Sequence, residues 1–138
     1  MRKLKYLLGI DLGTSGTKTV LFEETGRSVA SETIEYPLYQ PKNGWAEQEP
    51  EDWWNAARDT VKAVIAKSGV KPEDVKGVGI SGQMHGLVLL DREGRVLRRS
   101  ILWCDGRTQE ECDEITQTIG KDRLIELSAN PALTGFTA

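Results

Sequence analysis

Histidine and cysteine are scarce in this chain of 138 residues, which contains one histidine and two cysteines. A metal centre built from several histidines is therefore excluded, and any Ser-His-Asp mechanism would have to run through His85. Cys104 and Cys112 lie eight positions apart, a spacing that fits neither a zinc knuckle nor a CxxC redox pair. We expect both cysteines to be free thiols.

The chain also lacks a basic excess and a long apolar run. Its net charge is −3 at pH 7, whereas a surface that follows nucleic-acid phosphates usually needs a surplus of lysine and arginine. No apolar segment approaches the roughly 20 residues of a membrane helix. The apolar residues before Asp11 are too few for the core of a signal peptide. We predict a cytoplasmic protein that binds neither nucleic acid nor a membrane.

The composition, 38% hydrophobic and 28% charged, is that of an ordinary folded domain, and the pattern predicts an α/β fold with a mixed sheet. Apolar and alternating runs predict strands over residues 6–11, 19–23, 28–36, 75–81, 86–90 and 95–97, with a brief apolar segment at 101–104. Helical spacing predicts helices over residues 53–66, 108–119 and 121–129. Residues 37–50 and 130–138 are expected to be loops. Because the second loop is followed by no helix or strand, we expect the chain to be part of a longer one.

The segment between the first two predicted strands combines a carboxylate, small and hydroxyl residues, and a cation. Glycines let backbone N–H groups approach an anion, while hydroxyls and an ammonium group add further donors. A carboxylate oxygen suits Mg²⁺, which usually keeps several waters. We therefore expect Asp11 to hold the metal, and Gly13, Thr14, Ser15 and Lys18 to contact phosphate.

This segment is not a Walker A loop. That motif places lysine directly after its last glycine and opens a helix, whereas here Thr17 intervenes and a strand follows. Taken alone, the segment is equally consistent with a Gly-rich hairpin that carries a solvated aspartate. The motifs that follow it along the chain distinguish between these two interpretations.

Two later segments carry candidate sugar contacts. Met84 and His85 follow a predicted buried strand, at the kind of position where α/β proteins collect ligand contacts. Trp103 and Asp105 combine an aromatic face with an acceptor, as sugar sites do. From the residues alone, Met84 and His85 are better explained as a core methionine and an ordinary imidazole, and Trp103 is equally consistent with core packing.

Other conspicuous side chains favour structural roles. Arg107 can pair with Asp105 or with Glu110 one turn further on, and a structural salt bridge is the preferred interpretation. We expect the remaining tryptophans to be packing anchors: Trp45, Trp53 and Trp54.

Together these motifs resemble the FGGY carbohydrate kinases, which belong to the actin-like ATPase (ribonuclease H-like) superfold. The resemblance spans the chain and rests on segments in the family's order: Gly9–Lys18, Trp45–Gln48, Trp53–Trp54, Gly79–Gly86, Trp103–Thr108 and Asn130–Pro131. Within the family, Met84-His85 is similar to the xylulokinases, whereas glycerol kinases have Arg-Glu there. One departure is Gly106, where xylulokinases commonly have glutamine.

The resemblance implies phosphorylation of D-xylulose to D-xylulose 5-phosphate with ATP and Mg²⁺. Residues 1–138 would be the N-terminal part of the first kinase domain. Asp11 would serve the metal, the loop that follows it would serve the phosphates, and the sugar would meet Met84, His85, Trp103 and Asp105. The catalytic base and the adenosine contacts are expected beyond Ala138.

The chain alone is consequently expected to be inactive and to need the remainder of the kinase as its partner. Formation of a homodimer is left open. The alternatives are a non-catalytic half that binds sugar or complements a second polypeptide, a kinase of another sugar or polyol such as ribulose or glycerol, and an actin-like ATPase without a sugar substrate.

Overall fold

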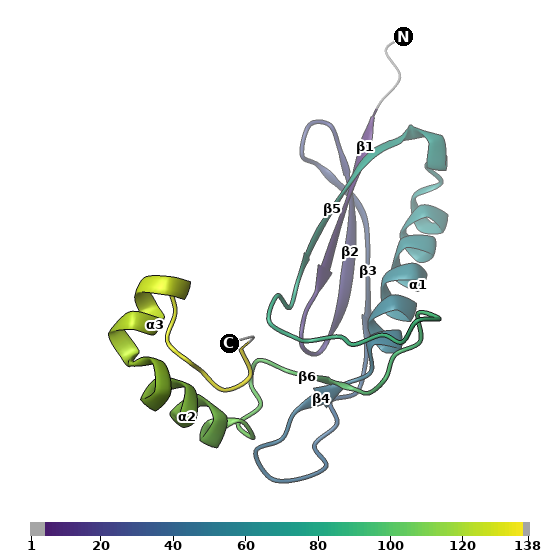
Figure 1. Cartoon of the computed structure of the whole chain (residues 1–138). Helices are drawn as coiled ribbons and strands as arrows, with labels where there is room; N and C mark the ends of the chain where they lie inside the picture. Colours follow the sequence, from purple (N-terminus) through teal and green to yellow (C-terminus); the bar gives the residue numbers. More distant parts are fainter. Residues whose placement is uncertain (1–4, 137–138) are drawn as a thin grey trace. The chain divides into compact units, whose positions relative to one another are not determined.

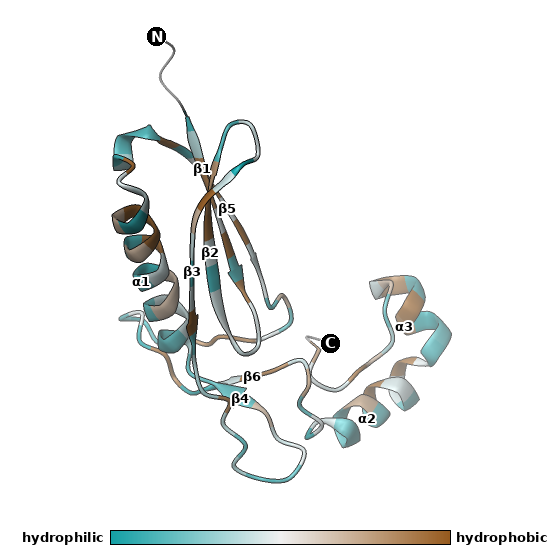
Figure 2. Ribbon diagram, turned by 180° about the vertical axis from the view of Figure 1, so that it is seen from behind, coloured by the Kyte–Doolittle hydropathy of each residue, from teal (hydrophilic) through white to brown (hydrophobic). Residues whose placement is uncertain are grey.

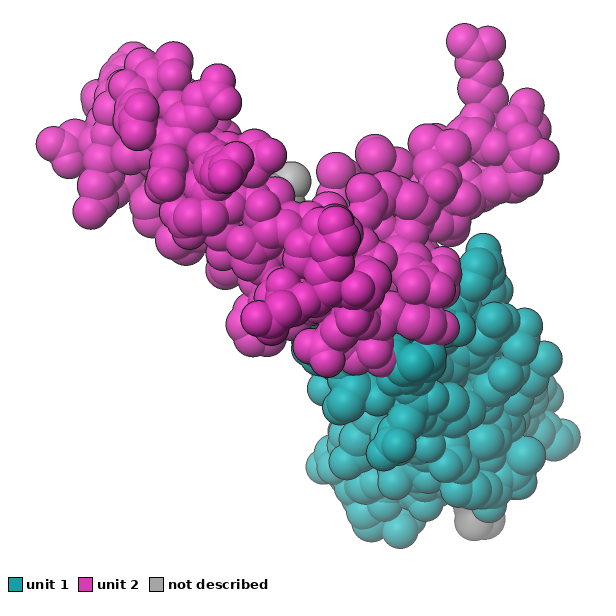
Figure 3. Space-filling view, turned by 90° about the horizontal axis from the view of Figure 1, so that it is seen from below, with its two compact units in different colours: residues 1–37, 51–83 teal, residues 38–50, 84–138 magenta. Residues whose placement is uncertain are grey.

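The computed structural model describes residues 5–136 and divides the chain into two compact units. Unit 1 comprises Met1–Pro37 and Glu51–Gln83, and unit 2 comprises Leu38–Pro50 and Met84–Ala138. Figure 3 colours them teal and magenta. Each unit is continuous in space but is built from two separate stretches of sequence.

Unit 1 is a four-stranded mixed sheet with a helix on one face (Figure 1). The strand order is β3-β2-β1-β5, with antiparallel pairing throughout except between β1 and β5, which are parallel. The elements are β1 Tyr6–Leu12, β2 Gly16–Glu23, β3 Ser28–Glu35, α1 Pro50–Ser68, a 3-10 turn η1 Pro72–Asp74 and β5 Val75–Gly82. The predicted mixed sheet, its first three strands and the strand at 75–81 are confirmed.

Helix α1 has local start and stop signals. Pro50 and the acidic Glu51 and Asp52 occupy its first turn, where a missing N–H costs nothing and negative charge is favourable. Gly69, at φ 65°, follows its last residue, in the left-handed conformation that glycine adopts without strain. The predicted helix is confirmed and extends by a few residues at each end.

The core of unit 1 lies between α1 and one face of the sheet. Leu8, Leu21 and Val64 are buried together, and the hydroxyl oxygens of Thr19 and Thr60 form a buried hydrogen bond of 2.7 Å across the same interface. Figure 2 shows the apolar residues of the strands next to those of α1. Among the described residues of unit 1, no helix lies over the other face of the sheet.

Unit 2 has little regular structure. It contains a short antiparallel pair, β4 and β6, and two helices that contact each other, α2 and α3. Their bounds are β4 Glu47–Gln48, β6 Ser100–Ile101, α2 Gln109–Ile119 and α3 Lys121–Ser128. Both helices match their predictions, but β4 was not foreseen, because two residues inside a predicted loop carry no periodic signal. No helix in the described part of the chain has the length and apolarity to cross a membrane.

The predicted strands at 86–90 and 95–97 are wrong. The chain turns back as expected around Asp91 and Gly94, which are joined by a backbone hydrogen bond of 3.1 Å. Only one bridge, Leu90 to Val96, links the two sides. A two-residue contact without a neighbouring sheet cannot sustain a longer ladder.

The two cysteines are free, as predicted, with Cys104 exposed and Cys112 buried on α2.

Candidate functional site

The loop between β1 and β2 is tightly held. The Gly13 N–H donates to the Gly16 carbonyl at 2.9 Å, and the Gly13 carbonyl accepts from the Tyr36 hydroxyl and from Gln83 Nε2. A Cβ on Gly16 would lie 2.7 Å from the Ile34 carbonyl oxygen, so only glycine fits there. The loop is thereby fixed from β3 and from the end of β5.

Tyr36 was not among the predicted site residues. Burial raises the pKa of its phenol, and the nearby Asp11 charge adds to this rise, whereas the neighbouring Thr17 hydroxyl opposes it. The phenol therefore stays protonated at neutral pH and can donate to Gly13. No local pattern marks Tyr36, because its role depends on the register of β3 against β2.

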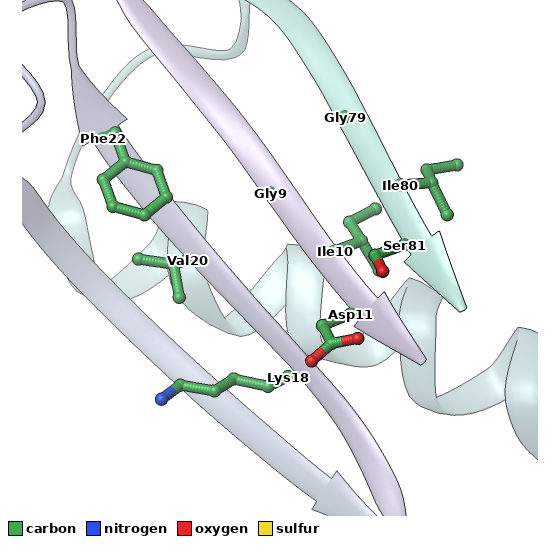
Figure 4. Close-up of a pocket in the computed structure, with 9 residues that line it drawn as sticks. All are labelled: Gly9, Ile10, Asp11, Lys18, Val20, Phe22, Gly79, Ile80 and Ser81. Carbon is green, nitrogen blue, oxygen red and sulfur yellow. The ribbon is translucent and has the colours of Figure 1, made fainter. Parts of the chain in front are cut away.

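Asp11 and Lys18 face each other across β1 and β2 as register partners. Figure 4 shows both side chains on the face of the sheet away from α1, bordering a hollow of about 480 Å³. The hollow is lined by Gly9, Ile10, Asp11, Lys18, Val20, Phe22, Gly79, Ile80 and Ser81. Its apolar floor thus carries one anion and one cation.

The surroundings of Asp11 fit a magnesium ion. Its carboxylate is exposed, and it forms no ion pair with another described residue. No group of three or more histidine, cysteine, aspartate or glutamate side chains gathers in the described residues. Mg²⁺ needs no such group, because it is commonly held by one or two carboxylates, substrate phosphates and water.

The predicted phosphate ligands have different environments. Ser15 and Lys18 are exposed, whereas Gly13 and Thr14 are half-buried. The Gly13 N–H is already donated within the loop, and the Ser15 carbonyl accepts from the Tyr36 N–H at 3.3 Å. The exposed side chains are therefore the groups that a phosphate can reach most directly, and their role stays a prediction.

In unit 2, Asp105 lies at the centre of an ionic cluster. Its Oδ2 accepts from the Ala46 N–H at 2.6 Å and from Arg107 at 2.7 Å, and its Oδ1 accepts from the Arg107 N–H and Nε, both at 2.9 Å. Arg107 also pairs with Glu47 at 2.8 Å and stacks on the Trp45 ring at 3.6 Å. The preferred structural interpretation of the Asp105–Arg107 pair is confirmed.

This cluster determines the charge of Asp105. Burial of the carboxyl raises its pKa, but the hydrogen bonds from Arg107 and Ala46 outweigh burial and hold the pKa below its ordinary value. The same hydrogen bonding has the opposite effect on the cation, because it raises the pKa of Arg107. Asp105 is 1% exposed and both of its oxygens have protein partners, so a direct sugar contact stays a prediction.

The other predicted sugar residues of unit 2 are accessible. Met84 is 79% exposed and Trp103 is 49% exposed, so neither is core filling among the described residues. The His85 imidazole is half-buried and lies against the Phe136 ring, with 4.1 Å between ring centroids and 41° between ring planes.

Comparison with known proteins decides the family. Residues 6–138 match the model of the FGGY family of carbohydrate kinases, N-terminal domain. The chain therefore belongs to the FGGY family. This FGGY chain is 45% identical over 134 residues to a xylulose kinase of Bacillus subtilis, covering 97% of this chain but 27% of that protein.

Solved structures agree with the fold. A xylulose kinase from Rhodospirillum rubrum superposes with a TM-score of 0.87 at 28% identity, over 95% of this chain and 27% of that one. A gluconate kinase from Lactobacillus acidophilus superposes with a TM-score of 0.81 at 31% identity, over 89% and 24%. The predicted actin-like ATPase fold is confirmed, and this FGGY chain spans about a quarter of the length of these relatives.

At Gly106, where this FGGY chain departs from the xylulokinases, the backbone could accept a side chain. The Gly106 N–H donates to the Gly44 carbonyl at 2.9 Å. A Cβ on Gly106 would meet that carbonyl oxygen at 3.6 Å, which is ordinary contact.

The prediction that the tryptophans are packing anchors is partly wrong. Trp45 lies between Arg107 and the Lys42 ammonium, 4.7 Å from the ring centre, and thus anchors the loop. Trp54, on α1, is 65% exposed and is therefore not a packing anchor in the described residues. Phe136 was missed altogether, since a lone aromatic in a loop gives no signal before its partner is known.

Proposed function

We propose that this chain forms the N-terminal part of the first domain of an ATP-dependent xylulose kinase, in which phosphate is transferred to D-xylulose to give D-xylulose 5-phosphate. The observation that carries the proposal is the position of Asp11 and Lys18 as register partners on one face of the sheet, beside a fixed Gly-rich hairpin. The high identity to xylulose kinases over nearly the whole chain supports it.

Unit 1 would serve the metal and the phosphates. Mg²⁺ bound beside Asp11 would neutralise part of the phosphate charge. Lys18 adds a positive charge on the same face of the sheet, and Thr14 and Ser15 add hydroxyl donors from the loop. The hydrogen bonds to the Gly13 carbonyl hold the loop in one conformation, so little ordering is required when the anion binds.

Unit 2 would serve the sugar. Trp103 offers an exposed aromatic face, Met84 an apolar wall, and the His85 imidazole a hydrogen-bonding group for hydroxyls. Asp105 would contribute mainly through Arg107 and the Ala46 N–H, which together fix the turn that carries Trp103. Alignment of the accepting hydroxyl is a large part of what a kinase supplies.

We assign the catalytic base, which removes the proton of the accepting hydroxyl, and the adenosine contacts to the part of the kinase outside residues 1–138. Asp11 is a poor candidate for the base, because a carboxylate committed to a cation has its charge drawn toward the metal. The chain by itself is therefore expected to release no ADP in the presence of ATP, Mg²⁺ and D-xylulose. Xylulose-dependent ADP release by the purified chain would contradict this division of labour.

Calorimetric titration of the purified chain with a panel of sugars tests the substrate class. We expect D-xylulose to bind more tightly than ribulose, gluconate or glycerol, and Trp103→Ala to remove most of the heat because it deletes the exposed aromatic face. Trp54→Ala is the matched control, since Trp54 is exposed on unit 1. Tighter binding of another sugar would reassign the substrate, and the absence of any sugar binding would contradict the assignment of the sugar contacts to unit 2.

A further inference from the structure

The His85 imidazole has an aromatic neighbour that comes from far along the chain. Its ring lies 4.1 Å from the ring of Phe136, centroid to centroid, and the two planes are tilted by 41°. Tilted aromatic pairs at this separation attract each other beyond the area that they bury. The contact therefore restrains how the imidazole can rotate.

The backbone around Gly135 is built to bring Phe136 to this place. Gly135 has a φ of 73°, and a Cβ there would lie 2.3 Å from the Trp103 carbonyl oxygen, a separation that no side chain can accommodate. The Phe136 N–H donates to the Leu133 carbonyl at 3.2 Å. A glycine-dependent turn thus lies directly on the backbone of Trp103 and carries Phe136 to His85.

We propose that Phe136 is a positioning residue for the His85 imidazole in the sugar site. The inference rests on the proposed function, and it goes beyond it by naming a residue that sets the orientation of the sugar-binding group without touching the sugar. A ring that is held on one face keeps one orientation, and its nitrogens keep one direction. A hydroxyl then meets an ordered partner and does not have to order a rotating one.

The single histidine of the chain makes the inference measurable. The carbon-bound protons of one imidazole give one pair of NMR signals, which can be followed in the wild type, in Phe136→Leu and in Phe136→Tyr. Phe22→Leu is the control for the ring signal, because Phe22 is the other phenylalanine of the chain and lies in unit 1. An amide spectrum of each variant verifies that it is folded.

We expect Phe136→Leu to shift the His85 signals, Phe22→Leu to leave them in place, and Phe136→Tyr to restore the wild-type positions. Titration with D-xylulose, followed through the same signals, is expected to show binding weakened about two- to tenfold in Phe136→Leu and restored in Phe136→Tyr, the range that one aromatic pair supplies.

Two results would overturn the inference while leaving the proposed function intact: unshifted His85 signals in Phe136→Leu, or shifted signals with unchanged sugar affinity. A wild-type chain whose His85 signals do not respond to D-xylulose would instead overturn the sugar role of His85 itself. The wild-type titration is measured before any substitution is made. It therefore tests the sugar role of His85 separately from the positioning role of Phe136.

Discussion

The two units of this chain are stabilised by different kinds of interaction. In unit 1 an apolar cluster, with Leu21 and Val64 fully buried, lies between a sheet and a helix beside the uncharged hydrogen-bonded pair of Thr19 and Thr60. Unit 2 is distinguished by an ionic cluster, in which the buried carboxylates of Glu47 and Asp105 both pair with Arg107. Apolar packing is destabilised when side-chain volume is lost, whereas an ionic cluster is destabilised when a charge is lost. The two units should therefore be destabilised by different substitutions.

The largest effect is expected in the core of unit 1. Leu21→Ala deletes a fully buried side chain and should lower the free energy of unfolding by about 2–5 kcal/mol, because transfer and cavity costs add. Leu7→Ala, on the open face of the same sheet opposite Phe22 and at 47% exposure, is the control and should change it much less. Amide hydrogen exchange of the unit 1 strands measures both. Equal effects would mean that the two faces of the sheet are equally buried in solution.

In unit 2 the corresponding substitution is Arg107→Ala. It leaves Asp105 and Glu47 without their shared cation, and we expect a loss of about 3 kcal/mol, the lower end for a broken buried pair because Arg107 keeps some exposure. Hydrogen exchange of the β4 and β6 amides gives the value. Arg58→Ala removes an exposed pair with Asp59 and should have little effect. A similarly small effect of Arg107→Ala would show that the cluster does not hold unit 2 together.

Acid should separate the units further. Because the pKa of Asp105 is depressed in the folded chain, its contribution is present above the ordinary aspartate pKa of about 3.9 and is lost as the pH falls through the depressed value. We expect unit 2 to lose protection below about pH 4, and Asp105→Asn to flatten that loss while lowering stability at pH 7. Urea unfolding from pH 7 to pH 3 checks this. An unchanged slope in Asp105→Asn would assign the acid sensitivity to other carboxyls.

A smaller effect is expected from a buried hydrogen bond between α1 and the sheet. Thr19→Val or Thr60→Val leaves its partner hydroxyl unpaired and should cost about 1–2 kcal/mol. The double variant should cost less than the sum, because no unpaired hydroxyl remains. A double-mutant cycle measured by urea unfolding gives the coupling. Additive losses would show that the 2.7 Å contact contributes nothing of its own.

The smallest change in stability is expected where the proposed function is concentrated. Asp11→Asn, on the open face of unit 1, should leave the unfolding midpoint unchanged, because the exposed carboxylate has no ion pair with a described residue. Binding of Mg²⁺ followed by NMR line broadening with Mn²⁺ as its substitute should be lost. Glu35→Gln, at the end of β3, is the control and should retain it. Retention in Asp11→Asn would remove Asp11 from the metal site.

The difference between the units also explains which parts of the fold could be predicted. The strands and the helix of unit 1 follow from period-two and helical patterns and from local signals such as Gly69, because a large apolar face imposes its periodicity on the sequence. In unit 2 the same patterns predicted both helices. They did not predict β4, and they predicted strands at 86–90 and 95–97 that the structure lacks. The ionic cluster of unit 2 imposes no such periodicity on the sequence.

By itself, the sequence determined the kinase family, the mixed sheet and the residue types of the loop between β1 and β2, since all of these are written in short contiguous motifs. Only the tertiary structure decided which groups hold those motifs in place. Asp105 reaches the Ala46 N–H across 59 positions, Gln83 reaches the Gly13 carbonyl across 70, and Phe136 reaches His85. Such contacts depend on strand register and on the path of the chain, which no local pattern encodes.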